Sequence, residues 1–128
     1  SDGMRKKGRF DILLYTTGGG YDPDSHLFSN YHSARIPSAD NEGAGNNFSR
    51  YINADVDALI DDAAFNADQE ARRTAYCKVA EQINKDIPRV FLYERMVISG
   101  YREQLQNFRV SPGYADMTLD SQNWWLQP

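Results

Sequence analysis

Apolar residues recur at helical spacing in the central part of the chain. A helix that starts at Asn53 or Asp55 and ends near residue 65 is predicted by its apolar positions, Val56, Leu59, Ile60 and Ala63. A longer helix from residue 69 to about residue 85 follows Asp68 as its N-cap, and its apolar stripe is Tyr76, Val79, Ala80, Ile83 and Ile87. The short link between the two helices predicts an antiparallel pair.

The segment before these helices combines a strand pattern with a helix start. The apolar run at residues 10–15 predicts a buried strand, and Gly18 to Gly20 follow it. Asp22 and Pro23 predict the N-cap and first residue of a helix that reaches about residue 31. The glycines are either a flexible turn or a place where a ligand approaches the backbone closely.

The remaining segments predict loops and strands. Residues 32–47 are polar and predict a long loop, whereas residues 89–99 are rich in β-branched and aromatic side chains and predict a strand. A short strand at 108–110 and a turn at 111–113 follow. The adjacent Trp124 and Trp125 point to opposite faces if the tail is extended, so at least one of them lacks a core. The pattern predicts an α/β fragment with a strand–helix–helix–strand core.

Composition and charge restrict the classes of protein. The 128 residues are enough for a single domain, 1–128, and the net charge of −4 argues against nucleic acid as a partner. No apolar run is long enough to span a membrane, and the N-terminus lacks a signal peptide. Because the chain starts with Ser1 and not with Met, we expect a fragment or a processed product. Cys77 is the single cysteine, which excludes an internal disulfide and predicts a packed or semi-buried thiol.

Candidate catalytic and metal-binding patterns are weak. Neither a dinucleotide-binding fingerprint nor a phosphate loop surrounds the glycines, and the spacing of His26 and His32 matches no metal motif, so we expect partly exposed loop histidines. An acidic cluster lacks the glycine and glutamate of a calcium loop and predicts a solvated helix face: Asp55, Asp57, Asp61 and Asp62. We therefore predict no catalytic residue, no metal site and no cofactor. Aromatic residues that flank the polar loops suit sugars or peptides: Tyr15, Tyr21, Tyr31, Phe48 and Tyr51.

A family resemblance rests on the order and spacing of residues 10–101. The matching positions are Phe10-Asp11, Asp22-Pro23, Asn46-Asn47, Tyr51, Asn53, Asp57, Leu59, Ala63, Asp68, Arg72 or Arg73, Tyr76, Ile83, Pro88 and Tyr93. With them the chain resembles the C-terminal region of extracytoplasmic solute-binding proteins of ABC importers, of the dipeptide, oligopeptide and nickel type. The last 25 or so residues match weakly.

The resemblance implies a two-lobed receptor of which this chain is the C-terminal part. Residues 10–101 would then belong to the core of one lobe, and residues 102–128 to a tail that returns to the other lobe. Such receptors trap a solute between their lobes by hinge closure. The implied partners are this solute, a membrane permease and the missing N-terminal part, which would carry a signal sequence or lipid anchor. The implied location is periplasmic or extracellular. An enzyme or a signalling sensor on the same scaffold is the alternative.

The resemblance also implies the ligand-binding residues. Peptide-binding relatives carry a Trp-x-x-Asp-Tyr motif whose Asp pairs with the amino terminus of the peptide, and here Thr16, Gly19 and Gly20 occupy the Trp, Asp and Tyr positions. Without this Asp, peptides with a free amine are disfavoured as ligands. The alternatives are an oligosaccharide and, as in nickel-type relatives, a metal chelate. The implied ligand-binding residues are Thr16, Thr17, Gly18, Gly19, Gly20, Tyr21, Asp22 and Asn46.

Overall fold

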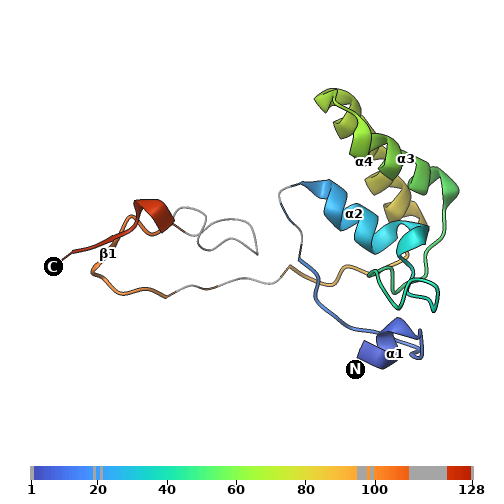
Figure 1. The fold of residues 1–128 in the computed structure, drawn as a ribbon, viewed down its shortest axis with the longest axis horizontal. Coiled ribbons are helices and arrows are strands. Elements are labelled where there is room, and N and C mark those ends of the chain that lie inside the picture. Colours follow the sequence, from blue (N-terminus) through green and yellow to red (C-terminus); the bar gives the residue numbers. More distant parts are fainter. Residues whose placement is uncertain are drawn as a thin grey trace.

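Helices make up most of the regular structure. The computed structural model describes residues 2–18, 20, 22–94, 98, 100–109 and 121–127. In chain order, the elements are α1 (Asp2–Lys6), α2 (Pro23–Tyr31), the short 3-10 helix η1 (Ser33–Arg35), α3 (Ala54–Phe65), α4 (Gln69–Asp86), β1 (Leu105–Gln106), a second 3-10 helix η2 (Ser121–Asn123) and β2 (Trp125–Leu126). Figure 1 shows α2, α3 and α4 together at one end of the molecule and the β1–β2 hairpin at the other. None of the described helices combines the length and the apolar character that crossing a membrane requires.

The three predicted helices are confirmed, and each begins at a side-chain cap. The Asp22 carboxylate accepts a hydrogen bond from the Asp24 N–H, and Pro23 is the first residue of α2. Asn53, and not Asp55, is the N-cap of α3, and Asp68 caps α4 as predicted. An N-cap of this kind typically stabilises a helix by about 1 kcal/mol, because it satisfies amide groups that have no partner inside the helix.

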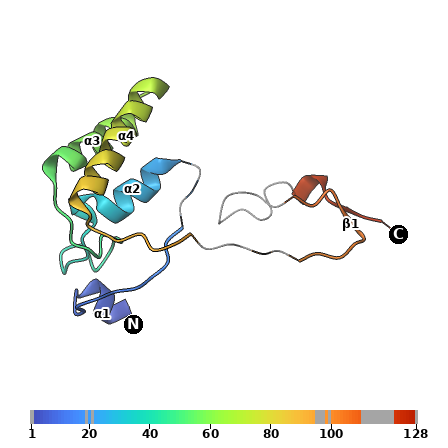
Figure 2. The same ribbon diagram turned by 180° about the vertical axis from the view of Figure 1, so that it is seen from behind.

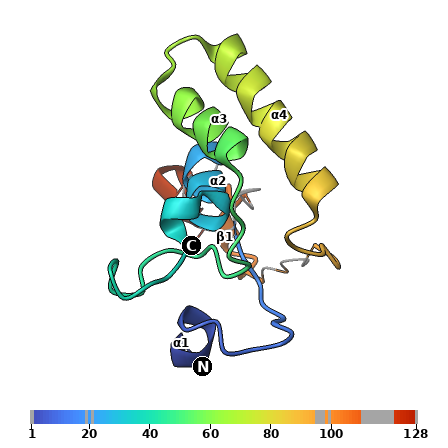
Figure 3. The same ribbon diagram turned by 90° about the vertical axis from the view of Figure 1, so that its right-hand side faces the viewer.

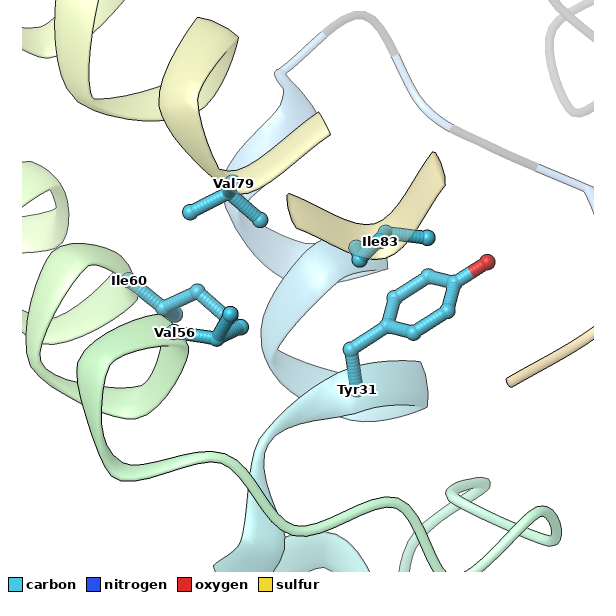
Figure 4. Packing of buried hydrophobic residues seen from close by; sticks show 5 residues of the cluster. All are labelled: Tyr31, Val56, Ile60, Val79 and Ile83. Carbon is cyan, nitrogen blue, oxygen red and sulfur yellow. The ribbon is translucent and has the colours of Figure 1, made fainter. Parts of the chain in front are cut away.

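The core forms where α2, α3 and α4 meet. α3 and α4 run side by side in opposite directions, as predicted, and α2 packs across them (Figure 3). Figure 4 shows how the buried side chains converge from the three helices: Tyr31 from α2, Val56 and Ile60 from α3, and Val79 and Ile83 from α4. These residues are 5% exposed or less, so the apolar stripe of α3 faces the interior as its spacing predicts.

The stripe predicted for α4 is only partly correct. Val79 and Ile83 are buried, but Ala80 and Ile87 are exposed, and Ala75 is buried in their place. Ile87 lies just beyond the helix in a left-handed conformation at φ 48°, and its N–H bonds the Ile83 carbonyl oxygen. The chain therefore leaves the helix axis at this point, which turns the Ile87 side chain away from the core.

The predicted loop between α2 and α3 is confirmed and is organised by a buried asparagine. The Asn47 side chain is fully buried, and its amide nitrogen donates to the carbonyl oxygens of Tyr31, His32 and Tyr51. Gly45 lies at φ 98°, and a Cβ atom there would be 2.1 Å from the Arg35 carbonyl oxygen. Only glycine fits here, because the backbones of two loop segments approach each other closely.

The predicted buried strand at residues 10–15 is wrong for this chain. The segment has no strand partner among the described residues, and Ile12 and Leu14 are 91% and 77% exposed. Leu13 and Tyr15 are half-buried. The side chains of this apolar run therefore alternate as in a strand, but no described residue covers those that point outward.

The described residues of the strands expected in the last third do not form strands at the predicted positions either. Residues 89–94 have no strand partner among the described residues, and Phe108 and Arg109 lie outside the hairpin. Instead, Leu105 pairs with Leu126 and Gln106 with Trp125 in the antiparallel β1–β2 hairpin. Residues 95–97 and 99 of the predicted strand at 89–99, Val110 and the predicted turn at residues 111–113 fall outside the described residues.

The two tryptophans differ in environment, as the alternation argument predicts. Trp124 is half-buried, with its ring 5.1 Å from that of Phe108, whereas Trp125 is 50% exposed. Figure 2 shows the helices and this hairpin from behind. The described part of the chain thus confirms the helices of the expected core and places its β structure elsewhere.

Candidate functional site

The predicted ligand-facing segment lies on the surface beside α2. Thr16, Thr17, Gly18 and Gly20 are exposed, whereas Gly19 and Tyr21 lie outside the described residues. The Gly18 carbonyl oxygen is 3.2 Å from His26 Nδ1, which donates to it. This contact fixes one point of the segment to the first half of α2.

Asp22 is engaged by the protein itself. Besides capping α2, its two carboxylate oxygens each lie 3.1 Å from Arg72 Nη2 on α4. Arg72 Nε in turn donates to the Ala63 carbonyl oxygen of α3 at 3.0 Å. The pKa of Asp22 is lowered, first by the hydrogen bond from the Asp24 N–H and then by Arg72. These contacts make Asp22 a link between the start of α2 and the α3–α4 pair.

Asn46 is held against the second half of α2. Its backbone N–H donates to the Ser29 carbonyl oxygen at 3.1 Å, and its side-chain amide donates to Ser29 Oγ at 3.0 Å. The Asn46 residue remains exposed. It is therefore both positioned by α2 and accessible at the surface.

Arg89 connects the elements around this surface, and sequence reasoning missed its role. Its Nη1 donates to Asn30 Oδ1 at 2.9 Å, and its Nη2 donates to the carbonyl oxygens of Asn30 and Asn46, both at 2.8 Å. The guanidinium also lies 5.4 Å from the centre of the Tyr15 ring and 4.8 Å from that of Tyr31. No local signal marks Arg89, because every partner is more than 40 residues away in the sequence.

The tyrosines beside Arg89 show that this junction is partly shielded from water. Burial raises the pKa of both Tyr15 and Tyr31, and the positive charge of Arg89 partly opposes this rise. The Tyr15 ring also meets the ring of Phe48 edge-on, with 5.7 Å between their centres. Tyr15 thus holds the chain against the protein, and the residues that follow it are exposed.

One face of α2 organises the whole candidate site. His26, Ser29 and Asn30 are three and four residues apart and therefore lie on the same side of the helix. They hold Gly18, Asn46 and Arg89, respectively. The structure thus brings the predicted ligand-facing segment and Asn46 to one helix face, and it adds Arg89, which bonds both Asn30 and Asn46.

An open groove between α2 and α4 adjoins the predicted segment. It has a volume of about 1100 Å³ and is lined by Gly20 and Asp22, by α2 through Pro23, His26 and Leu27, and by α4 through Arg72, Tyr76, Cys77 and Ala80. Cys77 is an exposed free thiol, so the packed or semi-buried thiol predicted from the sequence is wrong. Its position on the side of α4 away from Val79 explains the exposure, because Val79 faces the core.

The remaining polar candidates stabilise the loop after α2. His32 is buried and not a partly exposed loop residue, and its Nδ1 accepts a hydrogen bond from the Ala34 N–H at the start of η1. Asp57 accepts hydrogen bonds from the N–H and the hydroxyl of Ser33, so it is not part of a solvated face. Ser33 is therefore bonded to the carboxylate and not to the imidazole, which is not the geometry of a catalytic triad. Among the described residues, no three His, Cys, Asp or Glu side chains could hold a metal ion together.

The comparison with known proteins yields one informative relative. The chain is 29% identical over 108 residues to Di/tripeptide-binding protein 1 of Pseudomonas aeruginosa (strain UCBPP-PA14). The match covers 84% of this chain but 19% of that protein, so the chain spans about a fifth of its relative's length. This likeness supports a relationship to peptide-binding solute-binding proteins without assigning a subfamily. No protein-family model matches the chain, and no solved structure matches it significantly.

Proposed function

We propose that this chain is part of the ligand-binding component of an ABC importer, which captures an extracellular solute and delivers it to a membrane permease. The observation that carries the proposal is the similarity of 84% of the chain to a di/tripeptide-binding protein. The role is binding and transport and not catalysis. A periplasmic or extracellular location, and membrane association through the permease or a lipid anchor, belong to the same proposal.

The surface beside α2 is the proposed ligand wall. Thr16, Thr17, Gly18, Gly20 and Asn46 are exposed beside α2, where His26 bonds Gly18 and Ser29 bonds Asn46. Backbone groups of an exposed glycine segment can approach a ligand closely, and an exposed amide offers both a donor and an acceptor. In a two-lobed receptor, this wall would form one side of a cleft that closes on the solute.

The proposed ligand is a solute without a free amino terminus. Gly19 stands where peptide-binding relatives have the Asp that pairs with the ammonium group, and Asp22 is already bonded to Arg72. An ammonium group that loses its water without gaining a carboxylate partner is strongly destabilised. Blocked peptides, oligosaccharides and metal chelates fit the proposal better than free dipeptides.

The test is a thermal-shift and calorimetry screen of the complete protein encoded by the natural gene. The ligands are a free dipeptide, its N-acetylated form, an oligosaccharide series and a nickel chelate. A ligand at about 100 times its Kd adds about 2.7 kcal/mol to the free energy of unfolding, which is easily measured as a shift in Tm. We expect stabilisation by one of the last three ligands. Stabilisation by the free dipeptide would contradict the ligand class, and the absence of any response would argue against the receptor role.

A gain-of-function variant sharpens this test. Gly19→Asp restores a carboxylate at the position where the peptide-binding relatives have one, so we expect it to bind the free dipeptide better than the natural protein. Gly3→Asp adds the same charge at an exposed position in α1 and is the matched control. Equal dipeptide binding by both variants would show that position 19 does not face the ligand.

A further inference from the structure

A basic stretch surrounds the end of α1. Arg5 and Lys6 lie in the last turn of this helix, and Lys7 and Arg9 follow it directly. Positions 3–9 therefore hold four cations and no acidic residue. The C-terminal end of a helix favours positive charge only within its last turn, so the helix itself does not account for the cations beyond it.

A turn at Gly8 folds this stretch back on the helix. The Gly8 N–H donates to the Arg5 carbonyl oxygen at 3.2 Å. The Arg9 N–H donates to the Met4 carbonyl oxygen at 3.0 Å. This pair of bonds is a Schellman motif, in which Gly8 takes the expected left-handed conformation at φ 64°. The motif keeps Arg9 beside α1 and does not let the chain carry it away.

Arg50 adds a further cation from the loop before α3. Its Nη2 donates to the Lys6 carbonyl oxygen at 3.3 Å, and its Nη1 donates to the Pro37 carbonyl oxygen at 3.5 Å. Its guanidinium also fills the space beside Gly8, where a Cβ atom would lie 2.6 Å from Arg50 Nε. These contacts attach the end of α1 to the loop. Because carbonyl oxygens carry no net charge, they position the guanidinium without neutralising it.

The structure thus gathers exposed cations from two segments that are about 40 residues apart. We call them the basic surface, and its members are Lys6, Lys7, Arg9 and Arg50. Among the described residues, none of these four forms an ion pair, although the exposed Asp11 and Glu42 belong to adjoining segments. The basic surface is therefore opposite in sign to the chain as a whole, whose net charge is −4.

We propose that the basic surface binds the headgroups of an anionic lipid membrane. Clusters of about four to eight Lys and Arg residues are typical of such binding, because each cation is attracted by the negative potential at the lipid surface. Charges in water act over only about 8 Å at physiological ionic strength. The local basic surface, and not the net charge, therefore decides which face of the protein turns toward a membrane.

A lipid surface fits the basic surface better than an acidic face of another protein does. Stable protein interfaces are centred on apolar or aromatic anchors that fill a pocket. The basic surface offers exposed cations instead, and the groove between α2 and α4 includes none of them. The inference rests on the proposed extracytoplasmic location, which places a membrane within reach. It adds a direct lipid contact to the association through a permease or a lipid anchor.

The test is co-sedimentation of the complete protein, prepared without a lipid anchor, with vesicles of two compositions. One is pure phosphatidylcholine, and the other contains about 30% phosphatidylglycerol, which supplies the negative potential. We expect at least about 10-fold stronger binding to the anionic vesicles, and loss of most of this binding at about 0.5 M salt, because salt screens exposed charges. Equal binding to the two compositions, or binding that salt does not weaken, would overturn the proposal.

Paired substitutions in the complete protein locate the binding surface. Lys7→Gln combined with Arg9→Gln should weaken binding to the anionic vesicles by at least about 10-fold, because each cation near the membrane strengthens binding several-fold. Arg73→Gln combined with Lys78→Gln is the matched control. It removes the same two charges from exposed positions of α4, which Figure 3 shows apart from α1, and should leave binding nearly unchanged. All four positions are exposed, so Tm should not change in either variant. Equal weakening by the two pairs would overturn the proposal.

The remaining outcomes separate this proposal from its alternatives. If anionic vesicles were not bound, and the Lys7 and Arg9 variant instead weakened binding to the permease in pure phosphatidylcholine, the basic surface would belong to a protein interface. That result would overturn the proposal. Vesicle binding without any solute binding would overturn the transport role alone, and solute binding without vesicle binding would overturn the lipid contact alone.

Discussion

Arg89 joins segments that are distant in the sequence and that all border the proposed ligand wall. Two of its hydrogen bonds reach the Asn30 side chain and carbonyl oxygen near the C-terminal end of α2, where carbonyl groups lack helical partners and positive charge is favourable. The third reaches Asn46 in the loop. We predict that Arg89→Gln lowers the free energy of unfolding by about 2–3 kcal/mol, because hydrogen bonds to a charged donor are lost in a partly buried site.

Urea denaturation followed by far-UV circular dichroism measures this loss. The control is Arg73→Gln, which removes the same charge from an exposed position on α4 and should change the free energy of unfolding by less than about 0.5 kcal/mol. If Arg89→Gln and Arg73→Gln were equally stable, the hydrogen bonds of Arg89 would add nothing to the free energy of unfolding beyond the effect of removing one surface charge.

Tyr51 links stability to alkaline pH through Asp86. The Tyr51 hydroxyl donates to Asp86 Oδ2 at 2.5 Å, and burial followed by this carboxylate raises the pKa of Tyr51 to about 12. Because the Tyr51 pKa is higher in the folded protein than the ordinary value of 10 in the unfolded chain, the protonated hydroxyl stabilises the fold fully below pH 10. This stabilisation is lost as pH rises to 12. We therefore predict that the stability advantage of the natural chain over Tyr51→Phe shrinks as pH rises from 10 to 12.

Urea unfolding of both proteins at intervals between pH 8 and pH 12 checks this prediction, and the difference between them cancels the titration of the other tyrosines. An advantage that stays constant across this range would show that the Tyr51 hydroxyl does not keep its proton through Asp86.

At acid pH the same hydrogen bond has the opposite pH dependence, because there the carboxyl group of Asp86 titrates. The pKa of Asp86 is lowered, first by the hydrogen bond from Tyr51, so its contribution is lost as pH falls below the ordinary range of a carboxyl group.

The polar junctions could not be predicted from the sequence, because their partners are brought together only by the fold. The three loop carbonyls that Asn47 binds belong to residues up to 16 positions away, and Arg89 reaches across 43 and 59 positions. The family resemblance did single out Asn46 and Asn47. It could not show that Asn47 is a buried structural residue while its neighbour remains at the surface.

At the scale of elements, α3 depends on a cap that also connects it to α4. Asn53 Oδ1 accepts from the N–H groups of Asp55 and Val56, and Asn53 Nδ2 donates to Asp86 at 3.0 Å. We predict that Asn53→Ala lowers the free energy of unfolding by about 1–2 kcal/mol. Asn53→Ser keeps a capping oxygen but loses the donor to Asp86, so its loss should be clearly smaller.

Guanidinium denaturation of the three proteins separates the two contributions. Equal losses in the two variants would assign the whole effect to the Asp86 contact and none to the cap. The comparison is informative because serine and asparagine are similarly effective N-caps.

Helices were predictable and strands were not, for a physical reason. The signals of a helix are local: Asp22, Asn53 and Asp68 cap residues two or three positions ahead, and the apolar spacing repeats within each helix. A strand needs a partner for its backbone. Residues 10–15 and 89–94 have strand-like composition but no partner in the described part of the chain, whereas the short β1 and β2 have one.

At the scale of the whole molecule, the helical end has a buried core of its own and the proposed ligand wall is open. The core side chains of α2, α3 and α4 are buried against one another. The described residues of the wall, Thr16 to Gly18, Gly20 and Asn46, are exposed. A solute bound there would stay largely in water, unlike a ligand that is enclosed in a cleft.

This openness predicts that the chain alone binds its solute weakly or not at all. Small-molecule sites usually bury most of the ligand surface, and a wall without its opposite lobe cannot provide that burial or close on the solute. Isothermal calorimetry with the ligand identified by the screen compares the 128-residue chain with the complete protein. We expect the affinity of the chain to be at least about 100-fold lower than that of the complete protein, or undetectable. The loss corresponds to about 2.7 kcal/mol or more. Full affinity of the isolated chain would mean that the site is contained within α2, the glycine segment and the loop of Asn46, and that a two-lobed cleft is not required.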